Sequence, residues 1–175
     1  MVLGFSTKFP KAKGKLSGLF TRFPEKIMRS LDVAEYKKMT LFDGLAETLQ
    51  ENDIMPITDF LKLKPKKHTM RSDKKDRWKV GMNIDFFVGV RTKNMFRFAP
   101  KLEVKSIQTV KIIYDEEICE AFGSEPCVFI DEKPLHIDDY ETLAINDGFD
   151  SIYDFFEWFD RDFEGKIIHW TDLKY

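Results

Sequence analysis

Three side chains near the middle of the chain combine types and spacing that can do chemistry: Lys66, Thr69 and Arg71. Alternate side chains of an extended strand share a face, so Thr69 and Arg71 point the same way, and Lys66 can reach them across a turn. A hydroxyl beside an amine can serve as a nucleophile with its base, because desolvation or a neighbouring cation lowers the lysine pKa. Arg71 would complement a carbonyl oxygen or a phosphate. Each residue alone is equally typical of a surface lysine, a strand threonine or a solvated arginine.

These residues lie in a strongly basic stretch, 62–81, of a protein whose formal net charge is −2. Such a local positive field attracts anions, of which phosphate is the commonest in cells. A solvated loop between strands is the alternative interpretation of a charge run. Two details favour a site: Thr69 and Met70 interrupt the charges with a strand-like piece, and Trp78 places an indole among them.

Length and composition indicate one soluble globular domain. The chain has 175 residues, of which 43% are hydrophobic and 33% charged, and this is enough to bury a core. We expect neither a membrane span nor a signal peptide, and we expect a cytoplasmic protein in which Cys119 and Cys127 are reduced. The first 80 residues are basic and the rest acidic, so a nucleic acid would be held mainly by the first half.

The elements that must position the candidate residues are mostly strands. Apolar alternation and turn residues predict strands at 2–5, 83–90, 95–99, 127–130, 135–137 and 166–170. The longest strand signal runs over 102–114, with one slip of parity between Val104 and Ile107 that predicts a bulge. Helical spacing predicts helices at 23–31, 40–52, 138–147 and 152–159. The third of these ends at Asp147, and Ser151 is expected to cap the fourth. Many strands, few helices and no βαβ alternation predict an α+β fold built on a small mixed barrel.

Several classes of chemistry lack their sequence signals. The histidines and cysteines are scattered without the spacing of metal ligands, and no glycine-rich phosphate loop or G-x-S-x-G elbow occurs. We therefore expect no metal and no cofactor.

The stretch K-K-H-T-M-R-S-D-K-K-D-R-W-K-V-G-M resembles the signature of the ASCH domain family, whose members have a PUA-like β-barrel. The opening L-G-F, the F-P-E-K-I segment and N-D-G-F-D-S match in the same order, so the resemblance covers most of 1–175, with a helical insertion expected at 30–63. The family pattern G-x-K-x-x-E-x-R falls on Lys64, Lys66, Thr69 and Arg71. Lys64 stands where glycine is typical, and Thr69 stands where many members have glutamate.

The threonine is similar to that of a bacterial branch of the family that removes acetyl from 4-acetylcytidine. By this resemblance Thr69 attacks the acetyl carbonyl with Lys66 as base. The third catalytic residue of that branch, a glutamate, corresponds to Asp147, which would orient Lys66 or protonate the leaving amine. A residue at a helix end, before the capping Gly148, is the alternative interpretation of Asp147.

The resemblance otherwise implies binding of RNA or of a modified nucleotide in a basic cleft. Trp78 would then stack on a base, although a core indole is the alternative. The remaining ligand-binding candidates are Lys67, His68, Arg71, Arg77, Lys79 and Arg91. Three functions stay open: an RNA- or nucleoside-binding module, an enzyme that cleaves an amide or an RNA strand with Lys66, Thr69 and Asp147, and a protein-interaction role for the acidic C-terminal half.

Overall fold

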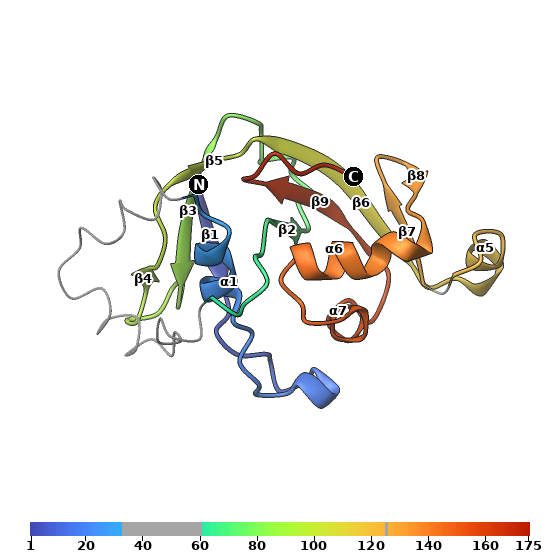
Figure 1. Ribbon diagram of the computed structural model, residues 1–175, viewed down its shortest axis with the longest axis horizontal. Helices are drawn as coiled ribbons and strands as arrows, with labels where there is room; N and C mark the ends of the chain where they lie inside the picture. The colour runs from blue at the N-terminus through green and yellow to red at the C-terminus, as the bar shows by residue number, and fades with distance from the viewer. Residues whose placement is uncertain (33–60, 125) are drawn as a thin grey trace.

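The computed structural model describes residues 1–32, 61–124 and 126–175, and it has an α+β fold with two sheets. In the smaller sheet β1 pairs in parallel with β3, and β4 and β5 pair antiparallel with β3. Its strands are β1 (Val2–Phe5), β3 (Asn83–Val88), β4 (Phe96–Arg97) and β5 (Leu102–Glu103). Figure 1 shows this sheet on the left, with β1 in blue and its partners in green to yellow-green.

The larger sheet is antiparallel, in the order β2, β9, β6, β7 and β8. Its strands are β2 (His68–Arg71), β6 (Ser106–Ile113), β7 (Cys127–Ile130), β8 (Lys133–Pro134) and β9 (Phe163–His169). The last strand of the β7–β8 hairpin was predicted at 135–137 but forms earlier, because Asp131 and Glu132 alone make the turn, both at positive φ. Over the described residues the pairing order does not close on itself, so a barrel is not seen there.

The predicted strand at 102–114 is divided between the two sheets. The Val104 amide donates to Met82 O on the smaller-sheet side at 2.8 Å, whereas the next amide, Lys105, donates to His169 O in the larger sheet at 2.9 Å. The slip of parity is therefore a corner between sheets and not a bulge within one strand. Alternation alone does not separate these cases, because each shifts the inward face by one residue.

Four α-helices lie among the described residues: α1 (Phe23–Arg29), α5 (Glu116–Glu120), α6 (Tyr140–Asn146) and α7 (Ile152–Trp158). Short 3₁₀ turns, η1 (Gly14–Leu16) and η2 (Ile137–Asp139), precede α1 and α6. The Ser151 cap is confirmed, since its hydroxyl accepts from the Asp154 amide at 3.2 Å. The helix α5 was missed, although Asp115 caps it. The helix predicted at 40–52 lies outside the described residues, and no described helix has the length and apolar character to cross a membrane.

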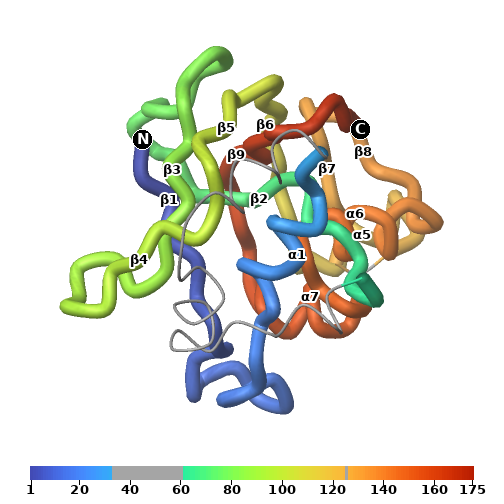
Figure 2. The backbone as a smooth tube through the Cα atoms, turned by 60° about the vertical axis from the view of Figure 1, so that its left-hand side comes forward, coloured from blue at the N-terminus to red at the C-terminus, as the bar shows by residue number. Residues whose placement is uncertain are grey.

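Aromatic side chains join the helices to the sheets. Phe23 of α1 packs edge-on against Phe149 with 5.4 Å between ring centroids, and Phe149 packs against Phe155 of α7 at the same distance. In Figures 1 and 2, β2 lies between the smaller sheet and the rest of the larger one. The helix α1, the strand β2 and the connection between α6 and α7 therefore surround one region of the protein.

Candidate active site

The free edge of β2 is covered by the end of α6. The Lys67 amide donates to Asn146 O at 2.8 Å, and the Met70 amide donates to Asp147 Oδ1 at 3.0 Å. An edge strand leaves such amides unpaired unless another segment covers them. Asp147 thus ends α6, as its place before Gly148 predicts, and also brings a carboxylate to β2. The interpretation of Asp147 as a helix-end residue is confirmed, and its catalytic role stays a prediction.

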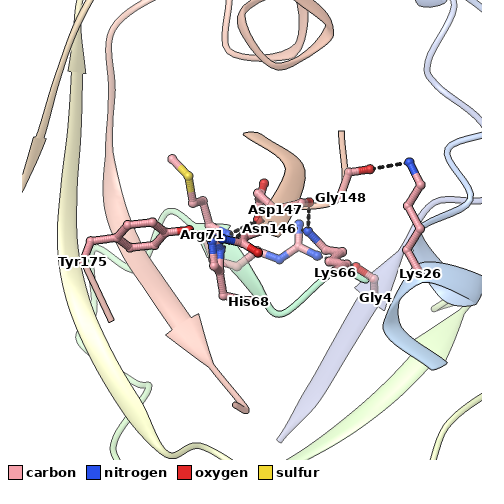
Figure 3. A network of polar contacts seen from close by, with 10 residues as sticks. Gly4, Lys26, Lys66, His68, Arg71, Asn146, Asp147, Gly148 and Tyr175 are labelled. Atoms are coloured by element: carbon pink, nitrogen blue, oxygen red, sulfur yellow. Dashed lines mark hydrogen bonds and ion pairs between the residues drawn. The ribbon is translucent and has the colours of Figure 1, made fainter. Parts of the chain in front are cut away.

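The Lys66 side chain is buried against this carboxylate, with 1% of its surface exposed. Its Nζ donates to Asp147 Oδ1 at 2.9 Å and to the Asp147 carbonyl (Figure 3). The same Nζ lies 4.8 Å from the centre of the Phe23 ring. Burial lowers the Lys66 pKa to about 8, although Asp147 opposes the shift. A fraction of the amine is therefore neutral near physiological pH, as a general base requires.

In the described part of the chain, the polar contacts of the Asp147 carboxylate are all made by one of its two oxygens, Oδ1. Besides Lys66 and the Met70 amide, His68 Nδ1 approaches the same Oδ1 at 3.4 Å. Burial by itself would raise the Asp147 pKa, but Lys66 and His68 together hold it below its usual value. None of the described residues donates a hydrogen bond to Oδ2. Asp147 is therefore ionised beside Lys66, with one oxygen left for other partners.

Lys66, Thr69, Arg71 and Asp147 line one pocket, which the sequence predicted for the first three. Its walls are completed by Gly4, Phe5, Ser6, Phe23, Met70, Phe149, Trp158 and Phe159. The Thr69 hydroxyl makes no hydrogen bond within the described part of the chain. The Arg71 guanidinium donates to Gly4 O at 2.9 Å and lies 5.0 Å from the centre of the Phe5 ring. A hydroxyl, an amine, a carboxylate and a guanidinium therefore share one small space.

The pocket is small, with a volume of about 40 Å³. A cavity volume of the same kind that holds one water molecule is roughly 10–15 Å³. The space fits a group of a few non-hydrogen atoms and not a whole nucleoside. A larger ligand would insert only one substituent here and leave the rest outside.

Two polar residues of this region were missed in the sequence. Lys26 of α1 is buried and donates to Gly148 O at 2.8 Å and to Asp150 at 2.6 Å, so it ties α1 to the chain just after Asp147. The Tyr175 hydroxyl lies 2.7 Å from His68 Nε2 (Figure 3). Neither residue stands in a motif, and only the fold brings them to the site.

Other predicted ligand-binding residues are placed differently. Trp78 lies in the hydrophobic core with 3% of its surface exposed, as the alternative interpretation of a core indole predicts, so it does not stack on a base as a ligand contact would. The exposed Arg77 and Lys79 precede β3, whereas Arg91 follows it. A six-residue strand spans about 20 Å, so these cations do not rim one cleft. Lys67 is half-buried just before β2 and lines a second hollow instead of this pocket.

No group of three or more metal-ligating side chains occurs among the described residues. Cys119 and Cys127 are both buried free thiols. Comparisons of the chain with protein-family models, with curated proteins and with solved structures found no match. Functional inference therefore depends on the site itself.

Proposed function

We propose that the chain is an amidohydrolase of the ASCH type, with a PUA-like arrangement of its two sheets, that removes a small acyl group from a modified nucleoside. The observation that carries the proposal is a buried lysine of lowered pKa in the same pocket as a threonine hydroxyl that has no hydrogen-bond partner among the described residues. The K-x-x-T-x-R spacing and its resemblance to enzymes that act on acetylated cytidine supply the substrate class. No cofactor is needed for this reaction.

The hydrogen bonds of Lys66 favour its role as base. A neutral amine has two N–H groups, which the carbonyl and carboxylate of Asp147 accept, and one lone pair that remains for a proton. The Thr69 hydroxyl gives its proton to this amine as its oxygen attacks the acyl carbon. Arg71, on the same strand face as Thr69, supports the negative charge that develops on the carbonyl oxygen.

The remaining steps restore the site. The carbon–nitrogen bond breaks, and the leaving nitrogen takes the proton that Lys66 holds. A water molecule then attacks the threonine ester and gives a proton to Lys66, and the carboxylic acid leaves as Thr69 regains its hydrogen. Asp147 stays ionised throughout and stabilises the ammonium form of Lys66. The size of the pocket favours a short acyl group, because the nucleoside itself must stay outside.

The test is acetate release from 4-acetylcytidine with the full chain and two variants of Thr69. Thr69→Val keeps the shape but removes the nucleophile, so we expect turnover to fall by at least about a thousandfold. Thr69→Ser keeps a hydroxyl and should retain a measurable part of the activity. Equal activity in the wild type and Thr69→Val would exclude Thr69 as the nucleophile. If the wild type does not hydrolyse 4-acetylcytidine, this compound is excluded as its substrate.

A second candidate function is binding of single-stranded RNA, which the exposed cations between β2 and β3 favour. Lys74, Lys75, Arg77 and Lys79 all face solvent there, and Asp73 and Asp76 offset only part of their charge. Such a surface attracts a phosphate chain without reading its sequence. The core position of Trp78 removes base stacking from this candidate, so charge alone would hold the RNA.

We expect Lys74→Glu/Lys75→Glu to weaken RNA binding roughly tenfold or more at low salt, and to reduce the salt dependence of the affinity by about two phosphate contacts. Fluorescence anisotropy of a labelled oligonucleotide across a salt series measures both effects. The matched control is Lys111→Glu/Lys133→Glu, which makes the same change in charge at exposed positions of the larger sheet. Equal losses in the two double variants would mean that only net charge matters and that this loop is not the binding surface.

A further inference from the structure

A line of polar contacts runs from the Tyr175 side chain through His68 to Asp147, behind the pocket (Figure 3). His68 is fully buried, and its ring points away from the face that carries Thr69 and Arg71. Its two nitrogens face different partners: Nε2 lies 2.7 Å from the Tyr175 hydroxyl and Nδ1 lies 3.4 Å from Asp147 Oδ1. The histidine therefore connects a phenol to the carboxylate that holds Lys66.

The partners determine which nitrogen carries the proton. Asn146 Nδ2 donates to the Tyr175 oxygen at 3.1 Å, and the hydroxyl hydrogen is left to donate to His68 Nε2. A neutral ring that accepts at Nε2 has its hydrogen on Nδ1, which faces Asp147. The opposite tautomer would place a lone pair against a carboxylate oxygen. Burial lowers the His68 pKa, so the neutral ring is the relevant form.

Tyr175 is itself held in place through its backbone. Its amide donates to Gln108 Oε1 at 3.0 Å, and its carbonyl accepts from Gln108 Nε2 at 3.0 Å. Gln108 lies on β6 and is buried, and Asp131 accepts from its Nε2 at 2.9 Å. The phenol is thus fixed relative to the larger sheet before it meets His68.

We propose that Tyr175 and His68 are positioning residues, which direct an N–H group at Asp147 Oδ1 and leave Oδ2 and the Lys66 amine to act in the pocket. Two donors bind this oxygen, Lys66 and the Met70 amide, and His68 Nδ1 faces it at 3.4 Å without a hydrogen bond to any described residue. The His68 donor withdraws charge from the carboxylate and weakens its hold on the lysine proton. The proposal rests on the proposed hydrolysis only for its effect on turnover, since the protonation states exist without substrate.

Titration of Lys66 is the first measurement, by NMR of its labelled side-chain carbon in the full chain. The charged and titratable groups around the Lys66 amine and the His68 ring are Asp147, Arg71, Lys26, Lys67, His169 and Tyr175. In Tyr175→Phe the ring of His68 loses its hydroxyl donor, so Asp147 alone still favours hydrogen on Nδ1 and the preference is weaker. We expect the Lys66 pKa to rise from about 8 by roughly half to one unit in this variant.

The control is Tyr140→Phe, which removes a buried hydroxyl that binds the Val128 amide and Ser124 away from the pocket. It should lower stability without moving the Lys66 titration. His68→Asn retains an N–H where Nδ1 stands and should keep the Lys66 pKa near that of the wild type, whereas His68→Leu should not. An unchanged Lys66 titration in Tyr175→Phe would overturn the proposal.

The tautomer of His68 gives a second, independent readout through the ¹⁵N shifts of its ring. We expect hydrogen on Nδ1 in the wild type and a smaller fraction of that tautomer in Tyr175→Phe. Hydrogen on Nε2 in the wild type would contradict the proposal even if the protein folds normally. If both readouts agree with expectation but 4-acetylcytidine is not hydrolysed, the positioning stands and only the proposed function fails.

Discussion

The Lys66→Met variant should lose at least about a thousandfold in kcat/KM for 4-acetylcytidine, because a thioether cannot accept the Thr69 proton. Methionine has nearly the length of lysine and fills the space against Phe23. Asp147 keeps the Met70 amide as a donor, so the end of α6 should stay in place. Acetate release measures the loss, and circular dichroism establishes that the variant is folded.

Lys67→Met is the matched control, since it removes a neighbouring amine that lines a different hollow and should leave turnover unchanged. The wild-type pH profile tests the same role. Only the neutral amine accepts a proton, so kcat/KM should rise about tenfold per pH unit below the Lys66 pKa of about 8 and level off above it. A profile that falls over this range, or a Lys66→Met enzyme with normal turnover, would rule out Lys66 as the base.

Gly148→Ala should be the most damaging substitution outside the reacting groups. Gly148 has φ of +94°, and an added Cβ would lie 2.7 Å from Lys66 Cδ and 3.0 Å from Phe23 Cδ1. The left-handed backbone and the overlap together should lower the free energy of unfolding by about 2–4 kcal/mol. The displaced lysine should also lose its alignment with Thr69, so turnover should fall with stability. Urea unfolding and acetate release measure the two effects.

The chain offers a close control in Gly123→Ala. Gly123 also has positive φ, +68°, but an added Cβ there would meet no atom of the described residues within 4 Å. That variant should lose only about 1 kcal/mol, the conformational part of the effect, and keep full activity. Similar losses in the two variants would mean that the contact with Lys66 contributes nothing.

Local patterns in the sequence predicted much of the fold and part of the site. The cap at Ser151, the strand at 2–5 and the grouping of Lys66, Thr69 and Arg71 follow from spacing along a few residues. The division of 102–114 between two sheets was not predictable, because it depends on partners more than 20 residues away in the chain. Long-range packing decides such corners, and alternation records only which residues face inward.

The sequence left two positions open for Trp78 and did not point to Tyr175, and both shortcomings have one cause. A tryptophan among lysines has the composition of a nucleic-acid surface, but Asp73 accepts from the Trp78 amide and turns the indole into the core. Tyr175 lies 107 residues from His68 in the chain, and only the pairing of β2 with β9 brings that end of the protein to the histidine. Residue type alone carries no information on such distances.

The contact between the end of α6 and β2 links function to self-association. Edge strands with open amides are templates on which a second chain can add a strand, and here Asn146 and Asp147 cover two of those amides. The carboxylate that holds Lys66 therefore also blocks intermolecular pairing at this edge. Loss of Asp147 would remove the carboxylate that binds Lys66 and would leave the Met70 amide unpaired at the edge of β2. Aggregation and loss of activity would then arise together from one substitution.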